Sequence, residues 1–228
     1  MMLFMKKVIL IIIVSVRLFA HDMWIDRENG LYTLHYGHLH LTKEHQGKKS
    51  IPYDPKKIKK VLCLKNQKVE ELVFAIKYPL EIKQSCDQLF VLMQNGYYTK
   101  TPYGTKNLPK KDVKLSLKSW KSIESIKRLD TLDNHLLGDG LEFVLLNHPS
   151  QEGDKIRLQL FYRKKPLKGA LVAYDGKVRG MSDDAGKINL RIKHGGLQNI
   201  QATMKQPCDD KDLCDEKIYT TTLNFEVK

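Results

Sequence analysis

Several motifs that identify common enzyme classes are missing from this chain. It contains no GxSxG, no HExxH and no glycine-rich phosphate loop, and none of its cysteines forms a CxxC pair. These motifs place nucleophiles, metal ions or phosphates in the most common hydrolases, metalloproteases and nucleotide-binding proteins. The sequence therefore offers little support for catalysis, and we expect a protein that binds without turnover.

The chain also lacks an apolar run of about 20 residues, the length that a membrane-spanning helix requires. Its longest run, Val8–Val14, follows Lys6 and Lys7 and is succeeded by a small residue at Ala20. A positive start, a short apolar stretch and a small residue are typical of a secretory signal peptide. We predict a signal peptide at residues 1–20 and a mature chain that begins at His21; an uncleaved anchor is the alternative.

Acidic residues are in the minority, with 26 Asp and Glu against 39 Lys and Arg, for a formal net charge of +13. The basic residues are spread along the chain, whereas a nucleic-acid-binding protein clusters them and interleaves aromatic residues. We therefore expect no nucleic-acid partner. The basic residues indicate a solvated surface or, alternatively, a face that docks on anionic lipid or an acidic membrane partner.

Cysteine is scarce, but the four cysteines form an even set, which in an exported chain favours disulfides. Cys208 and Cys214 bracket a short polar loop, and Cys63 and Cys86 lie among the earlier strand-like segments. Of the three connectivities that four cysteines allow, we predict the local one, Cys63 with Cys86 and Cys208 with Cys214. A zinc site built from these cysteines is less favoured because the CxxC spacing is missing.

Period-two alternation of apolar residues dominates the rest of the chain and predicts an all-β fold. One segment, "SLKSWKSIESIKRLD", has apolar residues spaced by three and indicates a short amphipathic helix or irregular arm. We place a first β domain at residues 21–148 and a second at 149–228, two sandwich-like units. Short strands at regular spacing make the second immunoglobulin-like or prealbumin-like; they are expected at 156–162, 170–174, 187–192, 199–204 and 220–227.

Histidine is concentrated near the predicted mature terminus, where residues 21–45 hold five of the eight histidines in the chain. Imidazole is a good ligand for Ni²⁺, Co²⁺, Cu²⁺ and Zn²⁺. His38 and His40 are two residues apart, so an extended strand puts both rings on one face. His35 falls on the opposite face unless a bulge at Gly37 turns it back. The predicted metal-binding residues are His21, His35, His38, His40 and His45, whereas His135, His148 and His194 are expected to be structural.

A mature amino-terminal His21 offers its α-amine and its ring Nδ1 to a metal as one chelate. A second imidazole from the neighbouring strand then completes a set of three nitrogens. Because the α-amine has an ordinary pKa near 8, metal must displace a proton and the affinity should fall in acid. Asp22 and Asp26 are weaker candidates, as oxygen donors or as groups that orient a histidine.

Several stretches together resemble a known family. They are "AHDMWI" after the leader, "YTLHYGH", "YDPKKIKKV", the long segment "GDGLEFVLLNHPSQEGDKIRLQLFYRKKPLKGALVAY", "SDDAGKINLRI" and "YTTTLNFEV". They resemble the exported nickel-uptake accessory proteins of the NikK type, which accompany energy-coupling-factor nickel and cobalt transporters. The resemblance covers nearly the whole mature chain.

The resemblance implies a periplasmic protein that binds Ni²⁺ or Co²⁺ and passes it to a membrane nickel transporter component. It implies His21, His35 and His38 as ligands, and a second domain similar to carboxypeptidase regulatory-like modules. His40, His45 and the four cysteines depart from the family pattern. Two alternatives stay open: a copper oxidoreductase that uses an amino-terminal histidine brace, and a structural or adhesion-type β-sandwich whose histidines are incidental.

Overall fold

Strands make up nearly all of the regular structure, so the predicted all-β class is confirmed. The computed structural model describes residues 21–39, 49–131 and 135–228. Within these ranges the other regular elements are two 3₁₀ turns, η1 (Pro55–Lys57) and η2 (Lys110–Asp112). No helix in the described part of the chain is long and apolar enough to cross a membrane. The predicted signal peptide at 1–20 lies outside the described residues.

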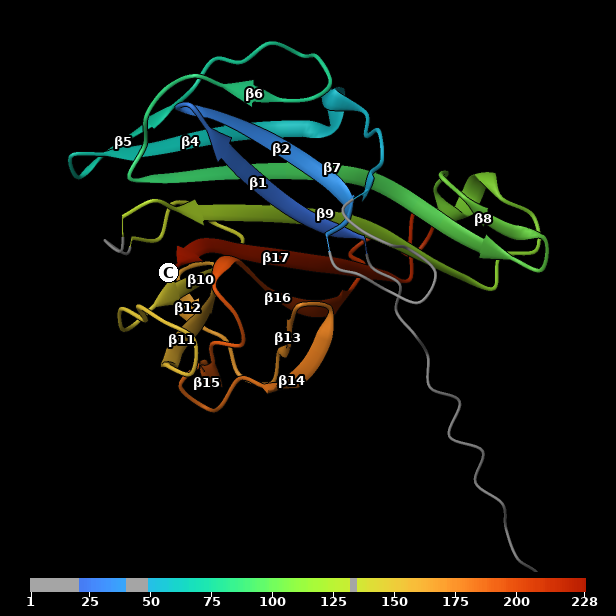
Figure 1. Ribbon diagram of the computed structural model, residues 1–228. Coiled ribbons are helices and arrows are strands. Elements are labelled where there is room, and N and C mark those ends of the chain that lie inside the picture. The colour runs from blue at the N-terminus through green and yellow to red at the C-terminus, as the bar shows by residue number, and fades with distance from the viewer. Residues whose placement is uncertain (1–20, 40–48, 132–134) are drawn as a thin grey trace, which may run out of the picture.

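A nine-stranded sheet forms the centre of the molecule (Figure 1). Its strands follow the order β14, β13, β16, β17, β9, β7, β4 and β5, with β8 added beside β7. Neighbouring strands are antiparallel except β17 and β9, which run parallel. The strands are β4 (Ile58–Lys65), β5 (Lys68–Glu71), β7 (Gln88–Thr101), β8 (Gly104–Lys106), β9 (Lys118–Leu129), β13 (Leu171–Tyr174), β14 (Lys177–Met181), β16 (Gly196–Pro207) and β17 (Glu216–Val227).

Two smaller sheets pack against opposite faces of this central sheet (Figure 1). The first holds β1 (Asp22–Glu28), β2 (Leu31–His38), β3 (Lys49–Ser50) and β6 (Glu81–Ile82); the second holds β10 (Leu141–Leu145), β11 (Lys155–Tyr162), β12 (Lys165–Pro166) and β15 (Lys187–Arg191). Ile126 and Leu129 on β9 point to opposite faces because they are an odd number of residues apart. Ile126 belongs to the core under β1 and β2, and Leu129 to the core under β10 and β11. The molecule thus has a sandwich on each side of one shared sheet.

The central sheet runs across the boundary predicted at 148/149. β17 pairs with β9 over ten positions, from Glu216 opposite Trp120 to Phe225 opposite Leu129. β10 precedes that boundary but pairs with β11, so it belongs to the second small sheet. The core under β10 and β11 also includes Leu129, Leu141, Phe143 and Leu145, which precede this boundary. Both side-chain packing and backbone hydrogen bonds thus join the two halves.

The helix predicted in "SLKSWKSIESIKRLD" is wrong, because this segment forms β9 in the middle of the central sheet. The prediction failed because β9 carries polar side chains at buried positions, where a typical strand has apolar ones. The remaining apolar residues are therefore spaced as in a helix. Ser125, Lys127 and Arg128 are all buried there and make hydrogen bonds or ion pairs. Tertiary partners for these polar groups override the local pattern.

Both predicted disulfides are present, Cys63 with Cys86 and Cys208 with Cys214. Their Cα atoms are 5.5 Å and 5.7 Å apart, within the usual range for a disulfide. No described cysteine is left as a thiol. Disulfides persist in oxidising compartments, so the two bonds indicate that this protein works in one.

Candidate metal site at the amino-terminal hairpin

The hairpin of β1 and β2 is set by its turn and by its register. Asn29 and Gly30 both have positive φ, 50° and 78°, as a two-residue type I′ turn requires and as an Asn-Gly pair favours. From this turn the pairing continues without a shift from Glu28 opposite Leu31 to Asp22 opposite Gly37. The face on which each side chain lies is therefore fixed along the whole hairpin.

This register brings His21 and His38 together at the open end of the hairpin. The centroids of their rings are 5.2 Å apart and the ring planes are tilted by 56°. Tyr36 lies beside them, with its ring centroid 5.1 Å from that of His21 and its hydroxyl oxygen 3.2 Å from His21 Nδ1. His21 is exposed and His38 is half-buried. Two imidazoles thus share one accessible spot.

The surroundings of His21 favour its neutral form. Burial lowers the pKa of the His21 imidazole, the nearby His38 lowers it further, and the carboxylate of Asp22 opposes both effects. Asp22 also accepts a 3.1 Å hydrogen bond from the backbone N–H of Leu39, which ties the end of β2 to β1. Because a metal ion binds neutral imidazole, the lowered pKa reduces the competition from protons.

His35 lies on the opposite face of the hairpin. Its ring stacks on Trp24 with 5.1 Å between centroids and 14° between planes. Its Nδ1 is 3.0 Å from Ser50 Oγ, and its Nε2 is 3.5 Å from Asp26 Oδ2. The pairing of β1 with β2 has no bulge at Gly37, so nothing turns His35 back toward His38.

Gly37 serves a different purpose, the close approach of β3. Its φ is +148°, and a Cβ atom added there would lie 2.1 Å from the backbone oxygen of Lys49. No side chain fits in that space, so glycine alone allows β3 to pair with β2 next to His38. The glycine of "HYGH" therefore shapes the strand pairing around the site.

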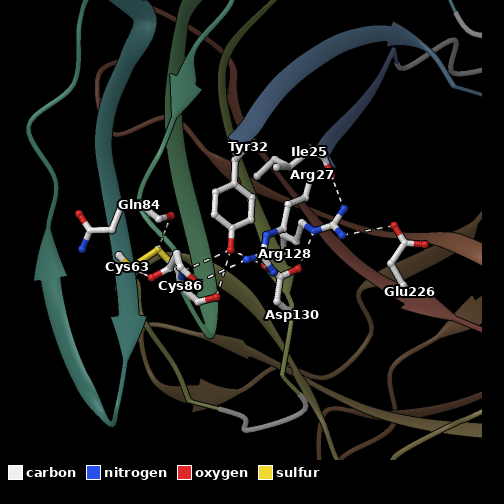
Figure 2. Close-up of polar contacts among 10 residues, drawn as sticks. Ile25, Arg27, Tyr32, Cys63, Gln84, Cys86, Arg128, Asp130 and Glu226 are labelled. Carbon is white, nitrogen blue, oxygen red and sulfur yellow. Dashed lines mark hydrogen bonds and ion pairs between the residues drawn. A yellow bond between two sulfur atoms is a disulfide. The ribbon is translucent and has the colours of Figure 1, made fainter. Parts of the chain in front are cut away.

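The edge of β1 that faces away from β2 is closed by side chains. Asn199 Nδ2 donates to the Met23 carbonyl at 2.8 Å, and the Ile25 N–H donates to Asn224 Oδ1 at 3.0 Å. Arg128 donates to the Ile25 carbonyl at 2.7 Å (Figure 2). Asn199, Asn224 and Arg128 are buried, and together they fix β1 and the His21 that precedes it. The sequence analysis did not single out these three residues. The feature that could have identified them is a polar side chain inside an otherwise apolar strand.

A second polar cluster fastens the hairpin near its turn (Figure 2). The Tyr32 hydroxyl donates to the carboxylate of Asp130 and accepts a 3.3 Å hydrogen bond from the N–H of Cys86. Arg27 pairs with the same carboxylate at 2.9 Å. Burial, and then the bond to Asp130, raises the pKa of Tyr32 to about 12. The hairpin, β9 and the Cys63–Cys86 disulfide are joined at this point.

The five predicted histidines are thus placed unequally. His21 and His38 lie together, His35 lies on the other face, and His40 and His45 lie outside the described residues. Across residues 21–39, 49–131 and 135–228, no group of three or more His, Cys, Asp or Glu side chains is arranged to hold a metal ion. The three-histidine set implied by the resemblance is not assembled there. His194, expected to be structural, is 3.0 Å from Asp175.

No protein-family model, no curated protein and no solved structure matches this chain. The resemblance to nickel-uptake accessory proteins therefore stays a prediction from the quoted residues.

Proposed function

We propose that this protein is exported to the periplasm, is cleaved before His21, and binds Ni²⁺ or Co²⁺ for delivery to a membrane nickel uptake transporter. The observation that carries the proposal is the adjacency of the His21 and His38 rings at 5.2 Å. Metal–imidazole bonds are roughly 2.0–2.1 Å long, so one ion can reach both rings with small side-chain rotations. The two disulfides support export.

Three nitrogens form the proposed ligand set: the α-amine and Nδ1 of His21, and the imidazole of His38. Cleavage creates the amine and thereby the chelate. Nδ1 of His21 is next to the Tyr36 hydroxyl at 3.2 Å, and this contact gives way when the metal binds. The exposed side of His21 leaves the remaining metal positions to water or to ligands from the transporter, which suits a carrier that must release its cargo.

Metal preference in the test tube does not identify the physiological metal. Affinity for a nitrogen site rises from Co²⁺ to Ni²⁺ to Cu²⁺ by the Irving–Williams order. Tighter binding of Cu²⁺ is therefore compatible with a nickel carrier, because supply in the compartment selects the ion. A copper oxidoreductase would in addition reduce oxygen when loaded with copper, and a carrier would not.

The test compares two preparations that differ only at the amino terminus, one that begins at His21 and one with a single Gly before it. Calorimetric titration with Ni²⁺ should show one-to-one binding that is at least about tenfold tighter in the first. The affinity of the first should fall between about pH 8 and pH 6, since protons compete for the amine and the rings. Equal binding by both preparations would refute the terminal chelate.

Delivery is tested separately in cells. Accumulation of radioactive nickel at limiting external metal should drop when the gene is deleted and recover with the wild-type chain. A His38→Ala chain should fail to restore it. Recovery by that variant would show that the His21–His38 pair has no part in uptake.

A further inference from the structure

A cavity of about 390 Å³ opens beside the hairpin, between His21 and the central sheet. It is lined by His21, Tyr36, Tyr98, Trp120, Ser122, Glu124 and Thr220. Three of the seven are aromatic, one is a carboxylate, and none is Lys or Arg. On a chain with a net charge of +13, a cavity lined by a carboxylate and by no Lys or Arg is an unusual local environment.

The strand pairing explains how these side chains meet. Trp120, Ser122 and Glu124 alternate along β9 and therefore share one face of the sheet. Tyr98 lies opposite Trp120 on β7, and the two rings stack with 5.7 Å between centroids and 16° between planes. Thr220 lies opposite Glu124 on β17. The floor of the cavity is thus part of the rigid central sheet.

Glu124 is a desolvated carboxylate without an ion pair among the described residues. Its Oε1 accepts hydrogen bonds from Asn95 Nδ2 at 2.8 Å and from Ser122 Oγ at 3.3 Å. Burial raises the pKa of its carboxyl more than these two hydrogen bonds and the charge of Lys57 lower it. The Lys57 ammonium lies over the ring of Tyr98, 5.8 Å from the centroid. A bound cation would stabilise the charged form of a carboxylate in such surroundings.

The cavity continues into a larger one of about 660 Å³ along the same sheet face. Trp120, Ser122, Glu124 and Thr220 line both. Leu171 and Ile218 add apolar side chains on this face of the sheet. Lys168 and Lys205 also line the larger cavity, and they pair with Asp184 at 2.7 Å and Glu216 at 3.8 Å. Both volumes lie in the range of small-molecule sites, about 300–1,000 Å³. The groove therefore has an acidic, aromatic end and an apolar end.

We propose that this groove binds an amphipathic primary amine, with its ammonium group at Glu124 and its apolar tail along Leu171 and Ile218. The carboxylate and the hydroxyls of Ser122 and Thr220 accept hydrogen bonds from the ammonium. The aromatic rings at this end add cation–π attraction, worth about 0.5–2 kcal/mol for a desolvated cation. The amine cavity shares His21 with the metal site proposed above, but Glu124, which carries the amine proposal, is not one of the proposed metal ligands.

The test uses metal-free protein in the presence of a chelator, titrated with three six-carbon probes: hexylamine, hexan-1-ol and hexanoate. Trp120 lies in the groove, so tryptophan fluorescence reports binding alongside calorimetry. Hexylamine should bind at least about tenfold tighter than hexan-1-ol, and hexanoate should bind most weakly. Methylammonium should bind more weakly than hexylamine, because it lacks the tail. Equal affinity for the amine and the alcohol would overturn the proposal.

Glu124→Gln keeps the size of the side chain and an oxygen for Asn95 but removes the charge. This variant should lose the preference for hexylamine over hexan-1-ol, and an unchanged preference would overturn the assignment of Glu124. An unchanged thermal midpoint shows that the variant is folded. His38→Ala should lose Ni²⁺ binding but keep hexylamine binding. Glu124→Gln should keep Ni²⁺ binding. The failure of one proposal is therefore distinguishable from the failure of the other.

Discussion

The guanidinium of Arg128 on β9 donates a 2.7 Å hydrogen bond to the backbone carbonyl of Ile25 on β1. β1 has a strand partner on one side only among the described elements, and this bond helps to close its other edge. The same guanidinium pairs with Asp130 at 2.9 Å. One buried cation therefore holds the strand that directly follows His21.

Replacing Arg128 by Ala should lower the free energy of unfolding by about 2–3 kcal/mol, since hydrogen bonds of a charged group are lost and a buried carbonyl is left without its donor. Chemical denaturation measures this loss. Glu226 also contacts Arg128, at 3.3 Å, but its side chain is 53% exposed. Glu226→Ala is the matched control and should cost less than about 1 kcal/mol. Similar losses in both variants would contradict the role given to the Ile25 bond.

His38 and His35 form a matched pair for testing the metal site, because they lie three residues apart on opposite faces of β2. On the proposed chelate, His38→Ala removes one of three nitrogen ligands and should weaken Ni²⁺ binding at least tenfold, about 1.4 kcal/mol or more. His35→Ala should leave the affinity within about twofold, since Trp24 and Asp26 surround that ring. Calorimetry on chains that begin at His21 decides between them. A loss only in the His35 variant would put the metal on the other face.

The comparison of these two histidines shows what the sequence can and cannot predict. Period-two alternation in "LYTLHYGH" correctly separates His35 from His38, because strand geometry alone sets the faces. The sequence predicts that His21 meets an imidazole from the neighbouring strand. That this imidazole is His38 depends on the register of β1 against β2, which the Asn29–Gly30 turn sets. Asn224 was not foreseeable, since its partner Ile25 lies 199 residues away in the chain. The place of Glu124 in the groove was not foreseeable either, since Thr220 lies opposite it on a strand that is distant in the chain. The helix predicted in place of β9 has the same cause, because the partners of its buried polar side chains also lie elsewhere in the chain.

Lys127 and Glu142 form a buried ion pair between β9 and β10, with Nζ and Oε1 2.8 Å apart and each side chain 1% exposed. Lys127→Met should lower the free energy of unfolding by about 3–5 kcal/mol, because it leaves the buried carboxylate of Glu142 without its ion-pair partner. Glu142 also accepts hydrogen bonds from the N–H groups of Leu137 and Gly138. The double variant with Glu142→Gln removes the stranded charge but keeps an acceptor, so it should recover much of the loss. A double variant as unstable as the single one would argue against this account.

The two disulfides should contribute unequally to stability. Cys63–Cys86 spans 23 residues and Cys208–Cys214 spans six. On the chain-entropy account, the first restricts the unfolded chain by about 3.4 kcal/mol and the second by about 2.2 kcal/mol. Paired Cys→Ser variants, compared by denaturant unfolding, measure both. The larger loss is expected for the first pair, and the reverse order would show that native-state packing dominates at the second loop.

His194 should make stability depend on pH near neutrality. Burial alone would lower the pKa of its imidazole, but the Gly195 carbonyl and the Asp175 carboxylate outweigh burial and raise it. A pKa that is higher in the folded state stabilises the protein at pH values below the unfolded value of about 6.5, and this contribution disappears as the pH rises through the folded value. Because the His194 side chain is 42% exposed, the effect should be small, about 0.5 kcal/mol. His194→Gln should therefore cost more at about pH 5.5 than at about pH 8.5 in denaturant unfolding. An equal cost at both values would mean that the His194–Asp175 contact does not need a charged imidazole.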